Sequence, residues 1–233
     1  MKAILLHHAG GDKYAYRNVQ QWLLPEYDSV AVELPGRSDR IREQLRYSME
    51  EIVEDIFQQI REEINSNYFF VGMSMGGLLA WLLTDKFRKE GRLLPKYIFL
   101  ASRMPIAYYT AKPNVKGITS ENFWQMILDY GGCPPALAEH KELREFYEPI
   151  LRADFEAMQD HAYAFQGMDV LNIPVSVLYG KDDLQNFDAA TMQRWDTYFE
   201  DRVEYRAFSG DHFFLYNNKE ATDYIKSKLR SLS

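Results

Sequence analysis

Short apolar runs alternate with helical patterns along most of the chain, and this alternation limits the folds open to it. The strand-like runs, rich in β-branched and aromatic residues, cover 3–6, 29–34, 68–71, 97–100, 175–179 and 203–208. Helical patterns cover 14–24, 49–65, 75–90, 189–199 and 219–229. Strands that alternate with helices form parallel sheets, because each return to the same edge needs a crossover. The sequence therefore predicts an α/β fold, with a mostly parallel sheet of about six strands flanked by helices.

One connection between strands is far longer than a crossover needs. It extends from Ser102 to Pro174, and a structureless loop of that length is implausible in a compact domain. Apolar residues recur in it at helical spacing, with a break at Gly131-Gly132-Cys133-Pro134-Pro135. We therefore expect a single domain over residues 1–233 that carries a helical insertion at about 105–172.

The segment Gly72-Met73-Ser74-Met75-Gly76 fits the pattern GxSxG and joins the strand at 68–71 to the helix at 75–90. A sharp bend from strand to helix projects the serine hydroxyl clear of the sheet, and small neighbours are needed where the backbones crowd. The first N–H groups of the helix then point toward the space above the serine. Ser74 is the candidate nucleophile, and the Met75 N–H is a candidate oxyanion donor. The alternative is a tight turn with an incidental serine.

A nucleophilic serine needs a base and a group that orients the base, which in sheets of this kind follow in the order Ser, Asp, His. His212 lies in a glycine-containing loop after the sixth strand and is the candidate base. Asp182 and Asp183 follow the fifth strand and compete for the orienting role. The spacing Gly180-x-x-Asp183 favours Asp183 and leaves Asp182 as a solvated neighbour.

A second oxyanion donor is expected from the loop after the first strand. His8-Ala9-Gly10-Gly11 occupies that place, where the Ala9 N–H can face the Met75 N–H across a substrate carbonyl. Alternatively, the two glycines only permit a tight turn. His7 and His8 are expected to be structural and to anchor this loop above Ser74.

Charge and cysteine content argue against several classes of protein. The chain has 233 residues and a net charge of −7, whereas nucleic-acid binders are normally basic and an acidic surface disfavours anionic membranes. Its one cysteine, Cys133, allows no intrachain disulfide, so the cytoplasm is the expected compartment. The sequence has no metal-ligand spacing and no lysine-bearing phosphate loop, so no cofactor is expected. No heptad pattern calls for a dimer, and we expect a monomer.

Several motifs, in this order and spacing, resemble those of the type II thioesterases that work beside nonribosomal peptide and polyketide assembly lines. The motifs are His8-Ala9-Gly10-Gly11, Leu34-Pro35-Gly36-Arg37, Gly72-Met73-Ser74-Met75-Gly76, Ser102-Arg103-x-Pro105, Gly131-Gly132-x-Pro134 and Gly210-Asp211-His212-Phe213-Phe214. The resemblance implies an α/β-hydrolase fold in which the insertion forms a lid. It also implies a Ser74, Asp183 and His212 triad that removes acyl groups from the phosphopantetheine arm of acyl or peptidyl carrier proteins. Met73 departs from the family pattern, which usually has histidine before the serine.

The triad alone does not select the acyl donor, so a small-molecule carboxylesterase or an acyltransferase of the same fold is an alternative. A non-catalytic binding protein is another. Within the insertion we expect an apolar cover over the acyl pocket, formed by Phe123, Trp124, Ile127 and Phe155. A basic rim for the carrier partner is expected at Arg103, Lys112 and Lys116, unless these are only solvated loop charges.

Overall fold

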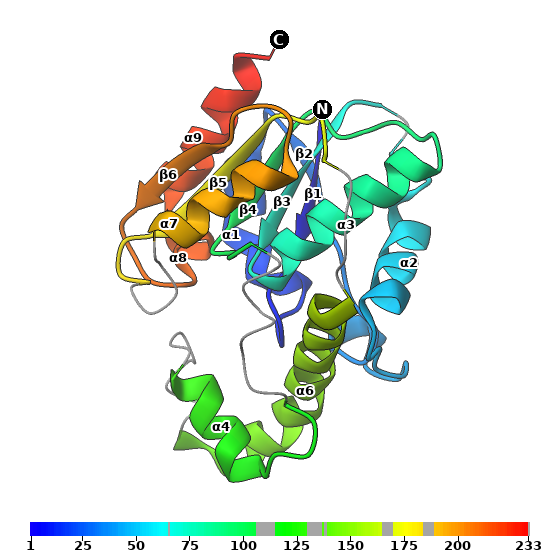
Figure 1. Cartoon of the computed structure of the whole chain (residues 1–233), viewed down its shortest axis with the longest axis vertical. Coiled ribbons are helices and arrows are strands. Elements are labelled where there is room, and N and C mark those ends of the chain that lie inside the picture. Colours follow the sequence, from blue (N-terminus) through cyan, green and yellow to red (C-terminus); the bar gives the residue numbers. More distant parts are fainter. Residues whose placement is uncertain are drawn as a thin grey trace.

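Parallel strands form one six-stranded sheet, in the order β2-β1-β3-β4-β5-β6, within the described part of the chain (Figure 1). The strands are β1 (Lys2–Leu6), β2 (Asp28–Ala31), β3 (Tyr68–Met73), β4 (Ile98–Ala101), β5 (Val175–Gly180) and β6 (Glu204–Phe208). Every adjacent pair in this order is parallel. The predicted α/β architecture is confirmed.

The structure is a computed structural model that describes residues 1–64, 66–105, 115–129, 137, 139–164, 170–183 and 189–232. The side chains of residues 161–164 and 189 are outside this description. No helix in these ranges has the length and apolarity needed to cross a bilayer.

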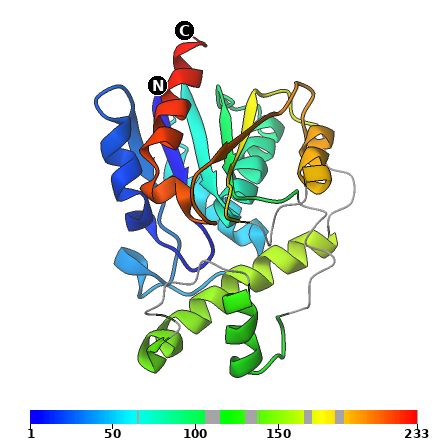
Figure 2. The ribbon, with the colours of Figure 1, turned by 90° about the vertical axis from the view of Figure 1, so that its left-hand side faces the viewer.

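Helices cover both faces of the sheet (Figure 2). One face carries α2 (Met49–Ile60), α3 (Met75–Lys89) and α7 (Ala189–Met192), and the other carries α1 (Arg17–Leu23), α8 (Phe214–Asn217) and α9 (Lys219–Arg230). Because side chains alternate along a strand, Ile4 and Leu6 lie in the first core while Ala3 and Leu5 lie in the second. Both faces of the four central strands are therefore largely buried, whereas the edge strands β2 and β6 are partly exposed.

Four predicted elements differ from the structure by three or more residues at one end or in the type of helix. The helix expected at 14–24 begins as a 3₁₀ turn (Lys13–Tyr16), the strand at 29–34 pairs only as far as Ala31, and the helix at 49–65 ends at Ile60. The segment 189–199 is α7 followed by a 3₁₀ helix (Gln193–Tyr198). There Trp195 is fully buried, and its indole N–H donates to the Arg103 carbonyl at 2.9 Å. Such a tertiary bond is not visible in a local hydrophobic pattern.

The insertion between β4 and β5 contributes α4 (Ser120–Asp129) and α6 (Lys141–Ala164), and α6 runs across the carboxyl edge of the sheet (Figure 2). An apolar cluster separate from the two main cores joins the helices, formed by Val115, Phe123, Trp124, Ile127 and Leu151. Phe155 packs against both this cluster and the main core. The residues expected to cover a pocket thus pack mainly on α6 and on one another. The break expected at 131–135 lies outside the described residues.

The bend between β3 and α3 brings backbones so close together that no side chain fits between them. A Cβ atom on Gly72 would lie 2.1 Å from the Gly76 carbonyl oxygen, and one on Gly76 would lie 1.9 Å from the Leu6 carbonyl oxygen. Ser74, at the bend itself, has φ 52° and ψ −111°, a conformation that costs energy in a residue with a side chain. The first turn of α3 therefore rests directly on the end of β1.

We predict that Gly76→Ala lowers the free energy of unfolding by about 3 kcal/mol, because its Cβ would meet backbone that cannot move aside. Gly91→Ala is the control, since Gly91 has φ +63° but no atom within 4 Å of its Cβ position. It should cost about 1 kcal/mol, from its backbone conformation alone. Urea unfolding of both variants measures the difference, and equal losses would contradict the prediction.

Candidate active site

Ser74 lies at the carboxyl end of β3, on the N-terminal side of α3. Its backbone is held on both sides: its N–H donates to the Ala101 carbonyl at 2.8 Å, and its carbonyl accepts from the Gly77 N–H at 2.9 Å. The helix that follows is 15 residues long, so the Met75 N–H belongs to its unpaired first turn. This arrangement presents a half-buried serine beside helix N–H groups that can bind negative charge.

His212 is hydrogen bonded to Asp183, with 2.8 Å between Nδ1 and Oδ2. Asp183 is buried, whereas Asp182 is exposed. A carboxylate only accepts hydrogen bonds, so this contact places the imidazole proton on Nδ1 and leaves Nε2 as the basic nitrogen. Of the two candidate carboxylates, the structure thus brings Asp183 to His212.

The loops that carry Asp183 and His212 are joined by their backbones. The Lys181 N–H donates to the Phe208 carbonyl at 2.8 Å, and the Asp182 N–H donates to the Gly210 carbonyl at 3.0 Å. A Cβ atom on Gly180 would lie 2.1 Å from the Asp211 carbonyl oxygen, so this position requires glycine. The close approach holds the two side chains within hydrogen-bonding distance.

The loop after β6 also reaches the loop after β1. The rings of His8 and Phe213 meet edge to face with centroids 4.7 Å apart, and His8 Nδ1 lies 2.7 Å from the Tyr216 hydroxyl. Because β3 belongs to the same parallel sheet, the Ser74 bend at its carboxyl end lies at the same edge as these two loops. Ser74, Asp183, His212 and Ala9 therefore all belong to one edge of the sheet.

In the loop of residues 8–11, hydrogen bonds to the His8 carbonyl fix the direction of the Ala9 N–H. This carbonyl accepts from the Gly11 N–H at 3.0 Å and from His7 Nδ1 at 2.8 Å. The peptide unit is planar and trans, so the Ala9 N–H points away from the side on which the carbonyl is held. The loop can therefore offer the Ala9 N–H to a ligand while its carbonyl stays satisfied.

His7 is buried and uncharged at neutral pH. Burial, and next the nearby Arg37 guanidinium, lower the pKa of His7 to about 4. Its Nε2 atom lies 3.9 Å from Glu33 Oε1. Because the ring is neutral, this contact is not an ion pair. Burial, followed by His7 and His212, likewise lowers the pKa of His8 well below its ordinary value. Two neutral histidines therefore support the 8–11 loop.

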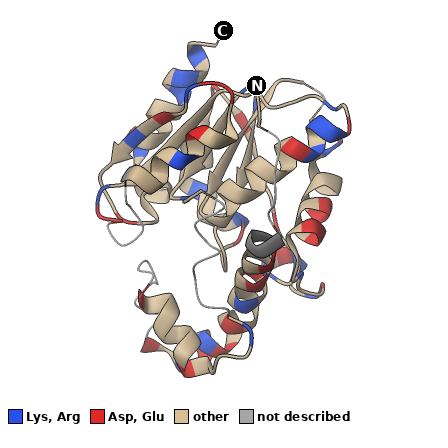
Figure 3. Cartoon of the chain, in the orientation of Figure 1, with Lys and Arg blue, Asp and Glu red and all other residues tan. Residues whose placement is uncertain are grey.

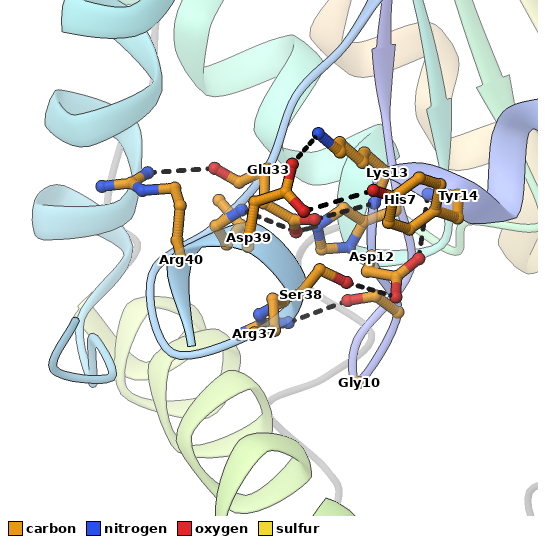
Figure 4. Close-up of polar contacts among 12 residues, drawn as sticks. His7, Gly10, Asp12, Lys13, Tyr14, Glu33, Arg37, Ser38, Asp39 and Arg40 are labelled. Carbon is orange, nitrogen blue, oxygen red and sulfur yellow. Dashed lines mark hydrogen bonds and ion pairs between the residues drawn. The ribbon is translucent and has the colours of Figure 1, made fainter. Parts of the chain in front are cut away.

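Arg37 and Asp154 form a buried, bidentate ion pair beneath the same loop. Nη1 and Nη2 of Arg37 lie 2.8 and 2.9 Å from Oδ2 and Oδ1 of Asp154. Figure 4 shows Arg37, on the loop that follows β2, with its side chain directed toward the loop that follows β1 and carries Gly10. Arg37 was identified in the sequence only as part of the motif Leu34-Pro35-Gly36-Arg37, with no role assigned, and Asp154 was not identified. A signal for it exists, because Asp154 interrupts the apolar stripe of Ile150, Leu151, Phe155 and Met158 at helical spacing.

The expectation that Arg103 belongs to an exposed basic rim is wrong. Arg103 is buried, and its Nη1 lies 3.4 Å from the sulfur of Met158. Lys116 is exposed but pairs with Asp160 of α6 at 2.6 Å, and Lys112 lies outside the described residues. Figure 3 shows acidic and basic residues interspersed along α6. Arg103 is buried because it contacts Met158 and Trp195, two residues far along the chain.

The remaining candidates are quickly placed. His140 is exposed, as a solvated position should be, and the side chain of His161 lies outside the description. Across the described ranges, no group of three or more His, Cys, Asp or Glu side chains is arranged to hold a metal ion.

The chain is similar in sequence to several known proteins. The sequence model of a family described as "Thioesterase domain" matches residues 2–230. The gramicidin S biosynthesis protein GrsT of Aneurinibacillus migulanus is 26% identical over 231 residues, which are 99% of this chain and 89% of that protein. The medium-chain S-acyl fatty acid synthase thioesterase of Homo sapiens is 25% identical over 84% of this chain and 74% of that one.

Solved structures share the fold. RedJ, a thioesterase from the prodiginine biosynthetic pathway of Streptomyces coelicolor, superimposes with a TM-score of 0.87 at 25% identity, covering 97% of this chain and 84% of RedJ. ClbQ, from the colibactin NRPS/PKS pathway, gives a TM-score of 0.90 at 23% identity, covering 99% of this chain and 97% of ClbQ. These superpositions cover nearly all of this chain, so the described helices of the insertion belong to the shared fold.

The buried His7 predicts a stability that rises with pH between about 4 and 6.5. The pKa of His7 is about 4 in the folded state and 6.5 ordinarily, so the unfolded chain binds the extra proton in this window. At pH 5 this costs about 2 kcal/mol of the free energy of unfolding relative to pH 7. His7→Asn keeps an N–H near the Nδ1 position but does not titrate, so urea unfolding at the two pH values should show that loss removed. An unchanged pH dependence would contradict the assignment.

Proposed function

The chain belongs to the thioesterase-domain family, and on that premise we propose that it hydrolyses acyl thioesters held on the phosphopantetheine arm of acyl or peptidyl carrier proteins. Its role is to clear misprimed or stalled units from nonribosomal peptide or polyketide assembly lines. Relatives named for gramicidin S and prodiginine biosynthesis support this setting. We further propose a cytoplasmic monomer that needs no cofactor and binds neither nucleic acid nor membrane.

The observation that carries the proposal is the Asp183–His212 hydrogen bond at the sheet edge that also holds the Ser74 bend. Asp183 orients the imidazole, and His212 Nε2 takes the proton of the Ser74 hydroxyl as its oxygen attacks the thioester carbonyl. The N–H groups of Ala9 and Met75 bind the oxyanion that develops on the carbonyl oxygen.

Collapse of this intermediate breaks the carbon–sulfur bond, leaves an acyl-serine ester and releases the pantetheine thiolate, which takes the proton from His212 and so restores the neutral imidazole. A thiol has a pKa of about 8.5, so the departure of the thiolate depends less on protonation than the departure of an amine does. His212 then removes a proton from water, which attacks the ester, and the carboxylic acid leaves as Ser74 regains its proton. Each step uses only side chains and backbone groups of this chain.

Substitution of the proposed triad should abolish hydrolysis while the chain stays folded. We expect Ser74→Ala, His212→Ala and Asp183→Asn each to lower kcat by about 10³-fold or more. Asp182→Asn is the matched control, since its exposed side chain should leave kcat within about threefold of wild type. Circular dichroism checks the fold. A Ser74→Ala protein with more than about a tenth of the activity, free of contaminating enzyme, would reject the mechanism.

The alternative functions are separated by three substrates with one common acyl group. We expect kcat/KM to be highest for the acyl-carrier protein, lower for the acyl-pantetheine and lowest for the oxygen ester. Equal rates on the oxygen ester would favour a carboxylesterase. Transfer to an added alcohol instead of release of free acid would favour an acyltransferase, and binding without turnover of any substrate would favour a binding protein.

A further inference from the structure

The insertion contributes a buried carboxylate, Asp154, beneath the loop of residues 8–11 that carries the proposed oxyanion donor. Asp154 lies in the middle of α6 and has no exposed surface. Its Oδ2 accepts from Arg37 Nη1 at 2.8 Å and from the Gly10 N–H at 2.7 Å, and its Oδ1 accepts from Arg37 Nη2 at 2.9 Å. Both oxygens are therefore engaged, and one of them holds the backbone of the 8–11 loop.

Arg37 also binds this loop directly, because its Nη1 donates to the Gly11 carbonyl at 3.2 Å. The carboxylate and the guanidinium thus bind the N–H of one loop residue and the carbonyl of the next. Together with the bond from His7 to the His8 carbonyl, they hold one backbone group before Ala9 and two after it. The direction of the Ala9 N–H follows from these bonds, since each peptide unit is rigid.

Van der Waals contact couples the same loop to α6. A Cβ atom on Gly10 would lie 2.4 Å from a methyl carbon of Leu151, one turn before Asp154. Gly10 also has φ +75°, a conformation that favours glycine. The loop therefore fits against α6 without space for a side chain, and a shift of the helix would move the acceptor of the Gly10 N–H.

We propose that Asp154, with Arg37, is a positioning residue that sets the Ala9 N–H for the oxyanion, so that the insertion completes the catalytic geometry in addition to covering the site. The inference rests on the proposed function, because it assigns a purpose to the Ala9 donor. A buried ion pair is seldom more stabilising than apolar residues of similar size, so stability alone gives little reason to place one here. A donor aligned before reaction, in contrast, acts directly on the transition state.

The test is a set of variants assayed with a small acyl-pantetheine. Asp154→Asn should lower kcat by about 10- to 100-fold with KM nearly unchanged, because removal of an entire oxyanion donor costs about 10²- to 10³-fold. The double variant Arg37→Met with Asp154→Leu removes both buried charges and should recover thermal stability. Its kcat should stay low, because leucine offers the Gly10 N–H no acceptor. Asp160→Asn, an exposed carboxylate on the same helix, is the control and should keep wild-type kcat.

A second readout reports on the tetrahedral state directly. An acyl trifluoromethyl ketone adds to the nucleophile as an oxyanion adduct, so its inhibition constant should rise across the variants in proportion to the loss of kcat/KM. A double variant that melts like wild type and regains kcat within about threefold would overturn the inference, as would a loss confined to KM. Activity that survives in Ser74→Ala would reject the proposed function itself, whereas full activity in Asp154→Asn beside an inactive Ser74→Ala would reject only this inference.

Discussion

The arrangement of the site depends on a contact between two stretches of backbone, the first turn of α3 and the end of β1. Gly76 lies against the Leu6 carbonyl with no room for a methyl group. This contact sets the separation between the Ser74 bend and the loop that begins at His7. The chain passes from β1 outward to β2 and then to β3 on the other side of β1, so the contact lies at the point where the strand order reverses. Parallel α/β sheets open a crevice at such a point, where ligands bind.

Beneath the loop of residues 8–11, the charge states of the buried polar groups keep them from repelling one another. Arg37 keeps its charge because Asp154 meets it with two hydrogen bonds. His7 lies close to the same guanidinium and stays neutral, and its single proton is used on the His8 carbonyl. The positive charge of Arg37 and the neutrality of His7 therefore depend on each other. Substitution of either one changes the electrostatic surroundings of the other.

The alternation of short apolar runs with helical patterns was sufficient to predict the parallel sheet, and the predicted resemblance to thioesterases is confirmed by the family match. The loops of Ser74, Asp183 and His212 were also located in advance, because each follows a strand that the pattern identifies. Arg103 and Asp154 show where local reasoning ends. Both are charged residues that ordinarily lie in water, and each is buried by partners from distant segments: Met158 and Trp195 for Arg103, and Gly10 and Arg37 for Asp154. Sequence spacing carries no record of such contacts.

The strand that begins the sheet and the helix that ends the described chain share one core. Ala3 and Leu5 of β1 lie in the same apolar cluster as Ile225 and Leu229 of α9. The Lys226 ammonium donates to the Trp22 carbonyl at 3.2 Å, which ties α9 to the end of α1. In a growing polypeptide this apolar face of β1 therefore stays without its α9 cover until residues 219–230 have left the ribosome. This face of β1 gains its full cover only when α9 packs on it, and chains truncated before α9 are the species most prone to aggregate.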